Sequence, residues 1–175
     1  PDDGGWFRSG KILPELTRAE DAMAGTRALR VVEVPDMPPG LALLDAPDVD
    51  SIDDDNRSLA RQLLLAADLW LFVTSAARYA DAVPWGFLRE ASARELVLAI
   101  VINRCPPPVL GEVARDLARM LRSEGLGDAP LFAIAESLHH DMIPADTVAP
   151  IRSWLGGIAS EAGQRAAVVK QSLGG

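Results

Sequence analysis

The stretch LALLDAPDVDS, residues 41–51, decides the fold that the sequence predicts. A short apolar run leads directly to a carboxylate, Asp45, and a proline and an acidic loop follow it. Open α/β sheets bind ligands at the carboxyl ends of their strands. The order of residues therefore predicts a strand over 41–46 with Asp45 at its ligand-binding tip. A carboxylate there can hold a hydrated Mg²⁺ through water, or it can cap the loop by accepting nearby backbone N–H groups.

Apolar runs and amphipathic stretches alternate along the rest of the chain. The runs predict strands at 29–34, 69–74, 96–102 and 131–135. The amphipathic stretches predict helices at about 54–67, 84–94, 113–121 and 147–172, and a short helical turn is expected near 14–21. The runs 29–34 and 41–46 read as a hairpin, and three strand–helix units follow it. We therefore expect an α/β fold, a mainly parallel sheet with helices on both faces.

Composition narrows the class of protein. A chain of 175 residues with 49% hydrophobic residues can bury a sizeable core. We predict an irregular N-terminal segment over 1–27 and one α/β domain over 28–175. The net charge of -8, with no dense basic run, argues against nucleic acid as a partner. No apolar run approaches the roughly 20 residues of a membrane span, and the single cysteine excludes an internal disulfide, so a cytoplasmic location is expected.

Acidic residues crowd the loop after the 41–46 run, and they have two interpretations. Carboxylates grouped in a loop can hold a hard cation such as Mg²⁺. Acids also favour the positive end of a helix, where Asp53 or Asp54 makes a good N-cap, and the local pattern favours this second interpretation. The residues concerned are Asp48, Asp50, Asp53, Asp54 and Asp55.

Other polar residues follow the later strands. Asn103 comes after the strongest apolar run, where it can touch a ligand or cap the turn that follows. Residues 75–79 follow the end of another predicted strand. They can line a ligand site, or they can form a solvated loop. Cys105 has no histidine at a recognisable catalytic spacing, which favours a packed residue. The cluster of His139, His140 and Asp141 reads as a surface loop, because a structural zinc site uses about four ligands.

Five of these stretches carry a resemblance to a known family. The GTPase domain of actinobacterial dynamin-like proteins, some of them catalogued as ABC transporters or ATP/GTP-binding proteins, is similar to this chain over about residues 28–172. The resemblance implies a P-loop NTPase-like fold. This chain contains no G-x-x-x-x-G-K-[ST] motif and begins with Pro1, so we expect a piece of such a domain that lacks the first strand and phosphate loop. The stretches are residues 41–51, 67–75, 77–85, 101–107 and 128–136.

The resemblance assigns a role to two residues on the phosphate side. Asp45 matches the magnesium-associated aspartate of the family's D-x-x-G motif. Asp48 stands at the glycine of that motif, in the second switch, where the family senses the terminal phosphate. The resemblance implies GTP or another purine nucleotide, with Mg²⁺, in the intact protein, and we expect neither to be bound tightly by this chain.

On the base side, the resemblance aligns the family's N/T-K-x-D motif with residues 103–106 of this chain. Asn103 matches its first residue, Arg104 replaces its lysine, and Pro106 stands where the guanine-reading aspartate belongs. Ala135 lies near the last base-contact segment. Because proline cannot accept the two hydrogen bonds that the aspartate takes from guanine, a preference for guanine has no support here.

Two functions follow from these assignments. One is a nucleoside triphosphate hydrolase in which water attacks the terminal phosphate, with this piece itself inactive. The alternative is a catalytically degenerate interaction module, since Asp48 and Pro106 depart from the motifs and the closing helix with Trp154 could dock a partner. In the family the missing strand lies between those ending at Asp45 and Ser75, so we also expect self-association through exposed sheet edges.

Overall fold

The computed structural model describes residues 5–19, 27–35, 37–38, 40–49, 51, 53–136 and 142–173, excluding the side chains of Trp6 and of residues 165–173. The chain divides into two compact units. The first comprises Pro1–Ala66 with Arg152–Gly175, and the second comprises Ala67–Ile151.

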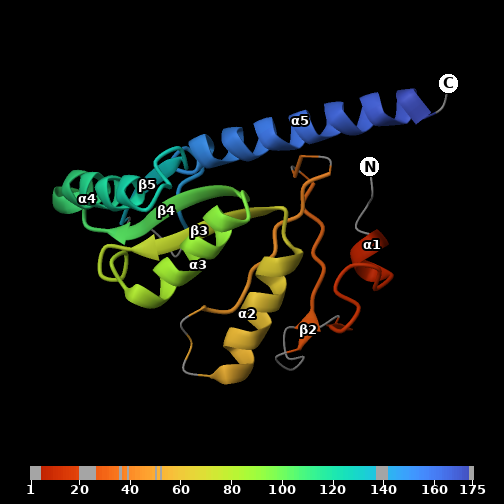
Figure 1. The fold of residues 1–175 in the computed structure, drawn as a ribbon, viewed down its shortest axis with the longest axis horizontal. Helices are drawn as coiled ribbons and strands as arrows, with labels where there is room; N and C mark the ends of the chain where they lie inside the picture. The colour runs from red at the N-terminus through yellow and green to blue at the C-terminus, as the bar shows by residue number, and fades with distance from the viewer. Residues whose placement is uncertain are drawn as a thin grey trace. The chain divides into compact units, whose positions relative to one another are not determined.

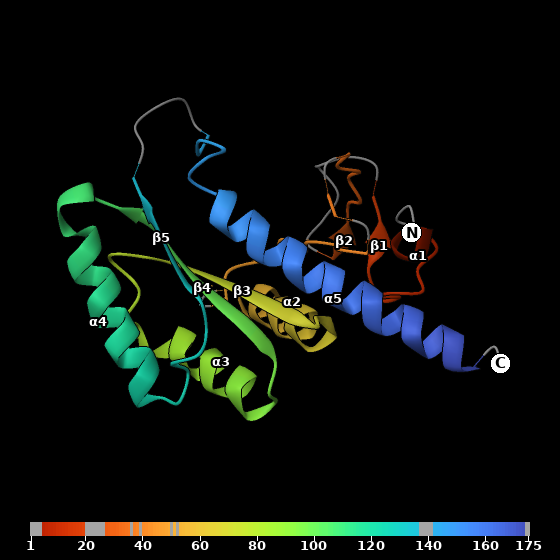
Figure 2. The ribbon, with the colours of Figure 1, turned by 90° about the horizontal axis from the view of Figure 1, so that it is seen from above.

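A three-stranded parallel sheet organises the second unit (Figure 1). Its strands lie in the order β3 (Leu69–Ser75), β4 (Val97–Cys105) and β5 (Leu131–Ala135). Helix α3 (Ala82–Ala93) connects β3 to β4. The 3₁₀ helix η1 (Pro107–Val109) and helix α4 (Leu110–Ser123) connect β4 to β5. Because the strands follow chain order and such crossovers are right-handed, both of these connecting helices lie on one face of this sheet (Figure 2).

Burial of the central strand explains why this unit folds as it does. Leu98, Ala99, Ile100, Val101 and Ile102 are consecutive, and none is more than 6% exposed. A strand covered on both sides reads as a continuous apolar run, which is how the sequence revealed it. The helices add Trp85, Phe87 and Leu88 from α3 and Leu117 and Leu121 from α4 to this core.

The first unit has a smaller core. It contains α1 (Gly5–Arg8), the two-residue parallel strands β1 (Thr17–Arg18) and β2 (Ala28–Leu29), α2 (Asp54–Ala66) and most of α5 (Ala149–Leu173). Leu13, Leu16, Leu59 and Leu63 pack together at its centre. The Arg18 guanidinium donates to several backbone carbonyls around it, including those of Leu13 at 3.0 Å and Leu16 at 2.6 Å.

The strands at 69–74, 96–102 and 131–135 and all four predicted helices are confirmed within a few residues. The predicted hairpin is wrong. Strand β2 ends at Leu29, and neither 30–34 nor 41–48 forms a strand. Val32, Val34 and Leu43 are 61%, 50% and 54% exposed. An alternating apolar pattern gives a strand only where a neighbour supplies ladder hydrogen bonds and a face to cover, and the described residues supply neither there. No helix forms over 14–19, where a turn closed by the hydrogen bond from the Leu16 N–H to the Leu13 carbonyl precedes β1, and residues 20–21 of the predicted helical turn lie outside the described residues.

Within the part of the chain that the structure describes, no helix combines the length and the apolar character needed to cross a membrane.

Candidate functional site

The carboxyl ends of the three strands in the second unit meet at one edge of the sheet. The register pairs Ser75 of β3 with Asn103 of β4, and Cys105 of β4 with Ala135 of β5. Asn103, Arg104 and Ala135, the three residues that the resemblance placed on the base side, therefore gather at the same edge. In open α/β sheets this edge is where ligands bind.

A β-bulge shapes the end of β4. Between the pairs Ile102–Ala133 and Cys105–Ala135, two residues of β4 oppose one residue of β5. Arg104 occupies the left-handed region at φ 50°, and its backbone N–H donates to Oδ1 of Asn103 at 2.8 Å. Bulges re-aim side chains and are common beside functional sites. The bulge leaves the exposed Arg104 side chain at the edge, without an ion pair to any residue that the structure describes.

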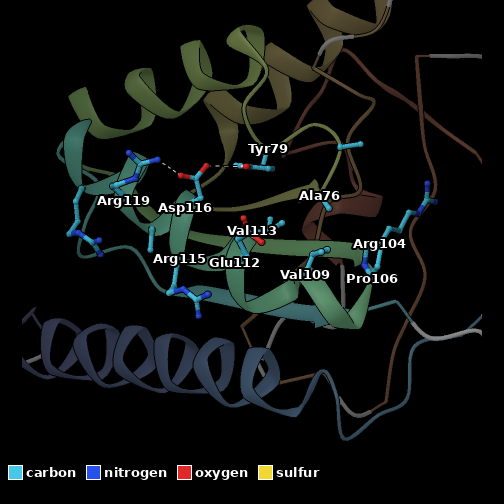
Figure 3. Close-up of a pocket in the computed structure, with 13 residues that line it drawn as sticks. Ala76, Tyr79, Arg104, Pro106, Val109, Glu112, Val113, Arg115, Asp116 and Arg119 are labelled. Carbon is cyan, nitrogen blue, oxygen red and sulfur yellow. Dashed lines mark hydrogen bonds and ion pairs between the residues drawn. The ribbon is translucent and has the colours of Figure 1, made fainter.

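An open depression of about 1140 Å³ lies beside this edge (Figure 3). Ala76 and Tyr79 line it from the loop after β3, Arg104 and Pro106 from the end of β4, and one face of α4 forms its long wall. Four of the lining residues are arginines and two are acids, an excess of two positive charges in a chain of net charge -8. Such a lining suits an anion. The charged residues are Arg104, Arg115, Arg119 and Arg122 with Glu112 and Asp116.

Tyr79 fixes one wall of the depression. Its hydroxyl donates to Oδ2 of Asp116 at 3.0 Å, its backbone carbonyl accepts the Trp85 indole N–H at 2.9 Å, and Arg119 forms an ion pair with Asp116. The hydrogen bonds from Arg119 and then Tyr79 lower the pKa of Asp116. The bond to Asp116, and then burial, raises the pKa of Tyr79. At neutral pH Asp116 is therefore ionised and Tyr79 is protonated. The hydrogen bond between them connects the 76–81 loop to α4.

The residues assigned to the phosphate side belong to the first unit. Asp45 and Asp48 are both exposed, and the Asp48 carbonyl accepts the Ser51 N–H at 3.1 Å. Among the residues that the structure describes, no group of three or more metal-ligating side chains comes together. The magnesium role of Asp45 and the switch role of Asp48 stay predictions.

Among the described residues, the acids that come after Asp48 in the sequence stabilise the start of helix α2. Oδ1 of Asp53 accepts the Asp55 N–H at 2.8 Å, which satisfies a donor in the first turn of α2. Oγ of Ser51 accepts the Asp53 N–H at 3.2 Å, and Asp54 forms an ion pair with Arg57. These bonds agree with the interpretation that the acidic residues cap the helix. Asp50 lies outside the described residues.

Two further candidates of the sequence carry little chemistry in the structure. Cys105 is 0% exposed, and burial, followed by the charge of Glu136, raises the pKa of its thiol. A buried, protonated thiol is a poor nucleophile. His139, His140 and Asp141 lie outside the described residues.

Sequence reasoning missed two features of this edge. Glu136 directly follows β5, its side chain is exposed, and its backbone N–H donates to the Cys105 carbonyl at 2.8 Å. It brings a carboxylate to the edge where Pro106 offers none. Arg115, Arg119 and Arg122 share one face of α4. The signals were available, because Glu136 follows a strand tip as Asp45 was expected to, and the arginines recur at helical spacing.

Comparison of the chain with models of known protein families, with curated proteins and with solved structures finds no match in any of the three.

Proposed function

We propose that this chain is the base-side part of a purine-nucleotide-binding switch domain of the P-loop GTPase type, related to dynamin-like proteins. The observation that carries the proposal is the alignment of Asn103, Arg104 and Ala135 at one carboxyl edge of a parallel sheet, beside a depression with an excess of positive charge. We also propose a cytoplasmic location, which fits a chain whose one cysteine is a buried thiol.

The chemistry of the edge suits a nucleotide. The Arg104 guanidinium can pair with a phosphate or stack on a base, and the Asn103 amide nitrogen can donate to an acceptor on that base. The Glu136 carboxylate can accept N–H groups of a purine, the task that Pro106 cannot perform. These three residues supply recognition only, and no proton transfer is assigned to them.

The proposal places Mg²⁺ on the phosphate side. Asp45 would hold the hydrated ion, and Asp48 would lie in the second switch of the intact domain, in which water attacks the terminal phosphate. Since the sequence contains no G-x-x-x-x-G-K-[ST] loop, the backbone N–H groups that cradle phosphates are missing. We therefore expect weak nucleotide binding and no hydrolysis by this chain.

An NMR titration of the 175-residue chain tests the proposal. Magnesium complexes of GTP and ATP, and inorganic triphosphate, are added separately to the labelled protein. We expect both nucleotides to shift the backbone amides at 75–77, 103–105 and 135–136, and Arg104→Glu to abolish the shifts. The matched control is Arg152→Glu, an exposed arginine of α5 outside the depression, which should leave them unchanged.

Two results would overturn the proposal. If these amides do not shift at high ligand concentration, the chain does not bind nucleotide at this edge. Equal shifts from inorganic triphosphate and from the nucleotides would show anion binding with no recognition of the base.

The second candidate is a catalytically degenerate interaction module that keeps the fold and has lost the chemistry. The observation that favours it is that two polar side chains considered for ligand or cation binding accept local hydrogen bonds instead. Oδ1 of Asn103 accepts a bond within the bulge, and Asp53 caps α2. A domain of this kind gives no nucleotide-dependent shifts in the same titration, so one measurement separates the two functions.

A further inference from the structure

The two outer strands of the sheet in the second unit differ in how their edges are protected. Strand β5 has five residues and follows Pro130, and short edge strands and prolines both hinder unwanted pairing. Strand β3 has seven residues, LWLFVTS, with no charge and no proline, and it is paired in unbroken register with β4. In the described sheet β3 has β4 as its one neighbour.

Burial also falls away toward the β3 edge. Val73 of β3 is paired with Val101 of β4, so their side chains share a face of the sheet. Val101 is 3% exposed and Val73 is 56% exposed. Only Trp70 among the seven residues of β3 is buried. A long, uncharged strand with an exposed valine and otherwise mostly half-buried side chains at a sheet edge is a template for another strand.

We propose that β3 pairs in antiparallel fashion with β3 of a second copy of this chain, so that two three-stranded sheets join across a two-fold axis. This inference is independent of nucleotide binding. Each copy uses in this pairing the one unprotected edge of its described three-stranded sheet, so pairing of this kind stops at a dimer.

The sequence of β3 favours a second copy as the occupant. In an antiparallel register centred on Phe72, Trp70 faces Thr74 and Leu71 faces Val73, so apolar and β-branched side chains meet across the new ladder. Asp68 at the start of one strand faces Ala76 at the end of the other, and no charge lies opposite its like. The net charge of -8 repels the copies at long range, and salt screens this repulsion.

Sedimentation velocity over a wide concentration range tests the proposal on the full chain. We expect a monomer–dimer equilibrium that shifts toward dimer as salt is added. Val73→Lys puts two like charges near each other across the new ladder, and it should weaken the dimer at least about tenfold, by the cost of like charges in facing strands and of a disrupted apolar pair. Val73 is exposed, so the substitution fits the folded monomer.

Two matched variants serve as controls. Val73→Thr keeps the shape and the strand propensity and should retain the dimer. Ala133→Lys adds the same charge at an exposed position of β5, the other edge strand, and should also retain it. A wild type that stays monomeric throughout, open-ended aggregation in place of a dimer, or equal loss in Val73→Lys and Ala133→Lys would overturn the proposal.

Hydrogen exchange gives a second readout that needs no variant. We expect the amides of β3 to become more protected as protein concentration rises, while those of β5 do not change. Protection of β3 that is independent of concentration would overturn the proposal even if some other surface mediated association.

Discussion

At the scale of single residues, Arg104 shows the clearest conflict between stability and function. An arginine at φ 50° occupies a backbone region that favours glycine, and non-glycine residues held there often mark functional sites. Arg104→Gly should relieve the strain and raise the free energy of unfolding by up to about 1 kcal/mol, because glycine enters this region without steric cost. The same change removes the guanidinium from the depression and should abolish the nucleotide-induced NMR shifts.

Urea denaturation and the NMR titration of Arg104→Gly measure the two effects separately. The proposed role of Arg104 predicts that they go in opposite directions. A variant that is more stable and still responds to nucleotide would show that the side chain takes no part in binding.

Tyr79 supports a pH prediction at the same scale. The pKa of Asp116 is lowered, so its contribution to stability is present above its ordinary value of 3.8 and is lost as the pH falls through the lower folded value. The pKa of Tyr79 is raised, so its contribution is present below 10.0 and is lost as the pH rises through the higher folded value. Tyr79→Phe removes the hydroxyl alone and should flatten the alkaline part of the profile while leaving the Arg119–Asp116 pair.

The measurement is the urea midpoint of wild type and Tyr79→Phe at neutral pH and above 10.0. We expect the variant to be less stable at neutral pH and the difference to shrink in alkali. A difference that stays constant across this range would show that the Tyr79–Asp116 hydrogen bond does not contribute.

At the scale of elements, the start of α2 separates a structural from a metal-binding role of the acidic segment. Asp53→Ala removes the acceptor of the Asp55 N–H and should lower the free energy of unfolding by about 1 kcal/mol, the usual cost of losing an N-cap. Asp55→Ala is the matched control, because Asp55 takes part in this bond through its backbone. Chemical denaturation with and without Mg²⁺ provides the measurement. Stabilisation of the wild type by Mg²⁺ that disappears in Asp53→Ala would favour the cation interpretation.

The elements also show what the sequence could predict. The sequence was sufficient to predict β3, β4, β5 and the four longer helices. In each of them the spacing of the apolar residues follows the side that is buried. The run 41–46 has a similar composition and forms no strand, since a strand also requires a partner that its own residues do not encode. The bulge at Asn103–Arg104 depends on the register with β5, and no glycine marks its left-handed position. The gathering of Asn103, Arg104 and Ala135 was predictable from parallel strand order alone.

At the scale of the whole molecule, the division into two units predicts how the native chain opens. Each unit has its own buried cluster, centred on β4 in one and on Leu13, Leu16, Leu59 and Leu63 in the other. Regions with separate cores exchange amide hydrogens through separate openings. We therefore expect the slowest exchange in β4, which is paired on both sides, and fast exchange at 30–34 and 41–48, which lie in no helix or strand.

Core substitutions in each unit make this prediction quantitative. Ile100→Ala in β4 and Leu63→Ala in α2 both truncate buried side chains and should each cost about 2–5 kcal/mol. If the units open separately, Ile100→Ala accelerates exchange in β3, β4 and β5 and leaves α2 unchanged, while Leu63→Ala does the reverse. Equal acceleration of both regions by either variant would show instead that the chain unfolds as one cooperative body. In that case a ligand bound at the strand ends would stabilise the residues around Asp45 as strongly as its own site, because binding raises the stability of everything that unfolds together with the site.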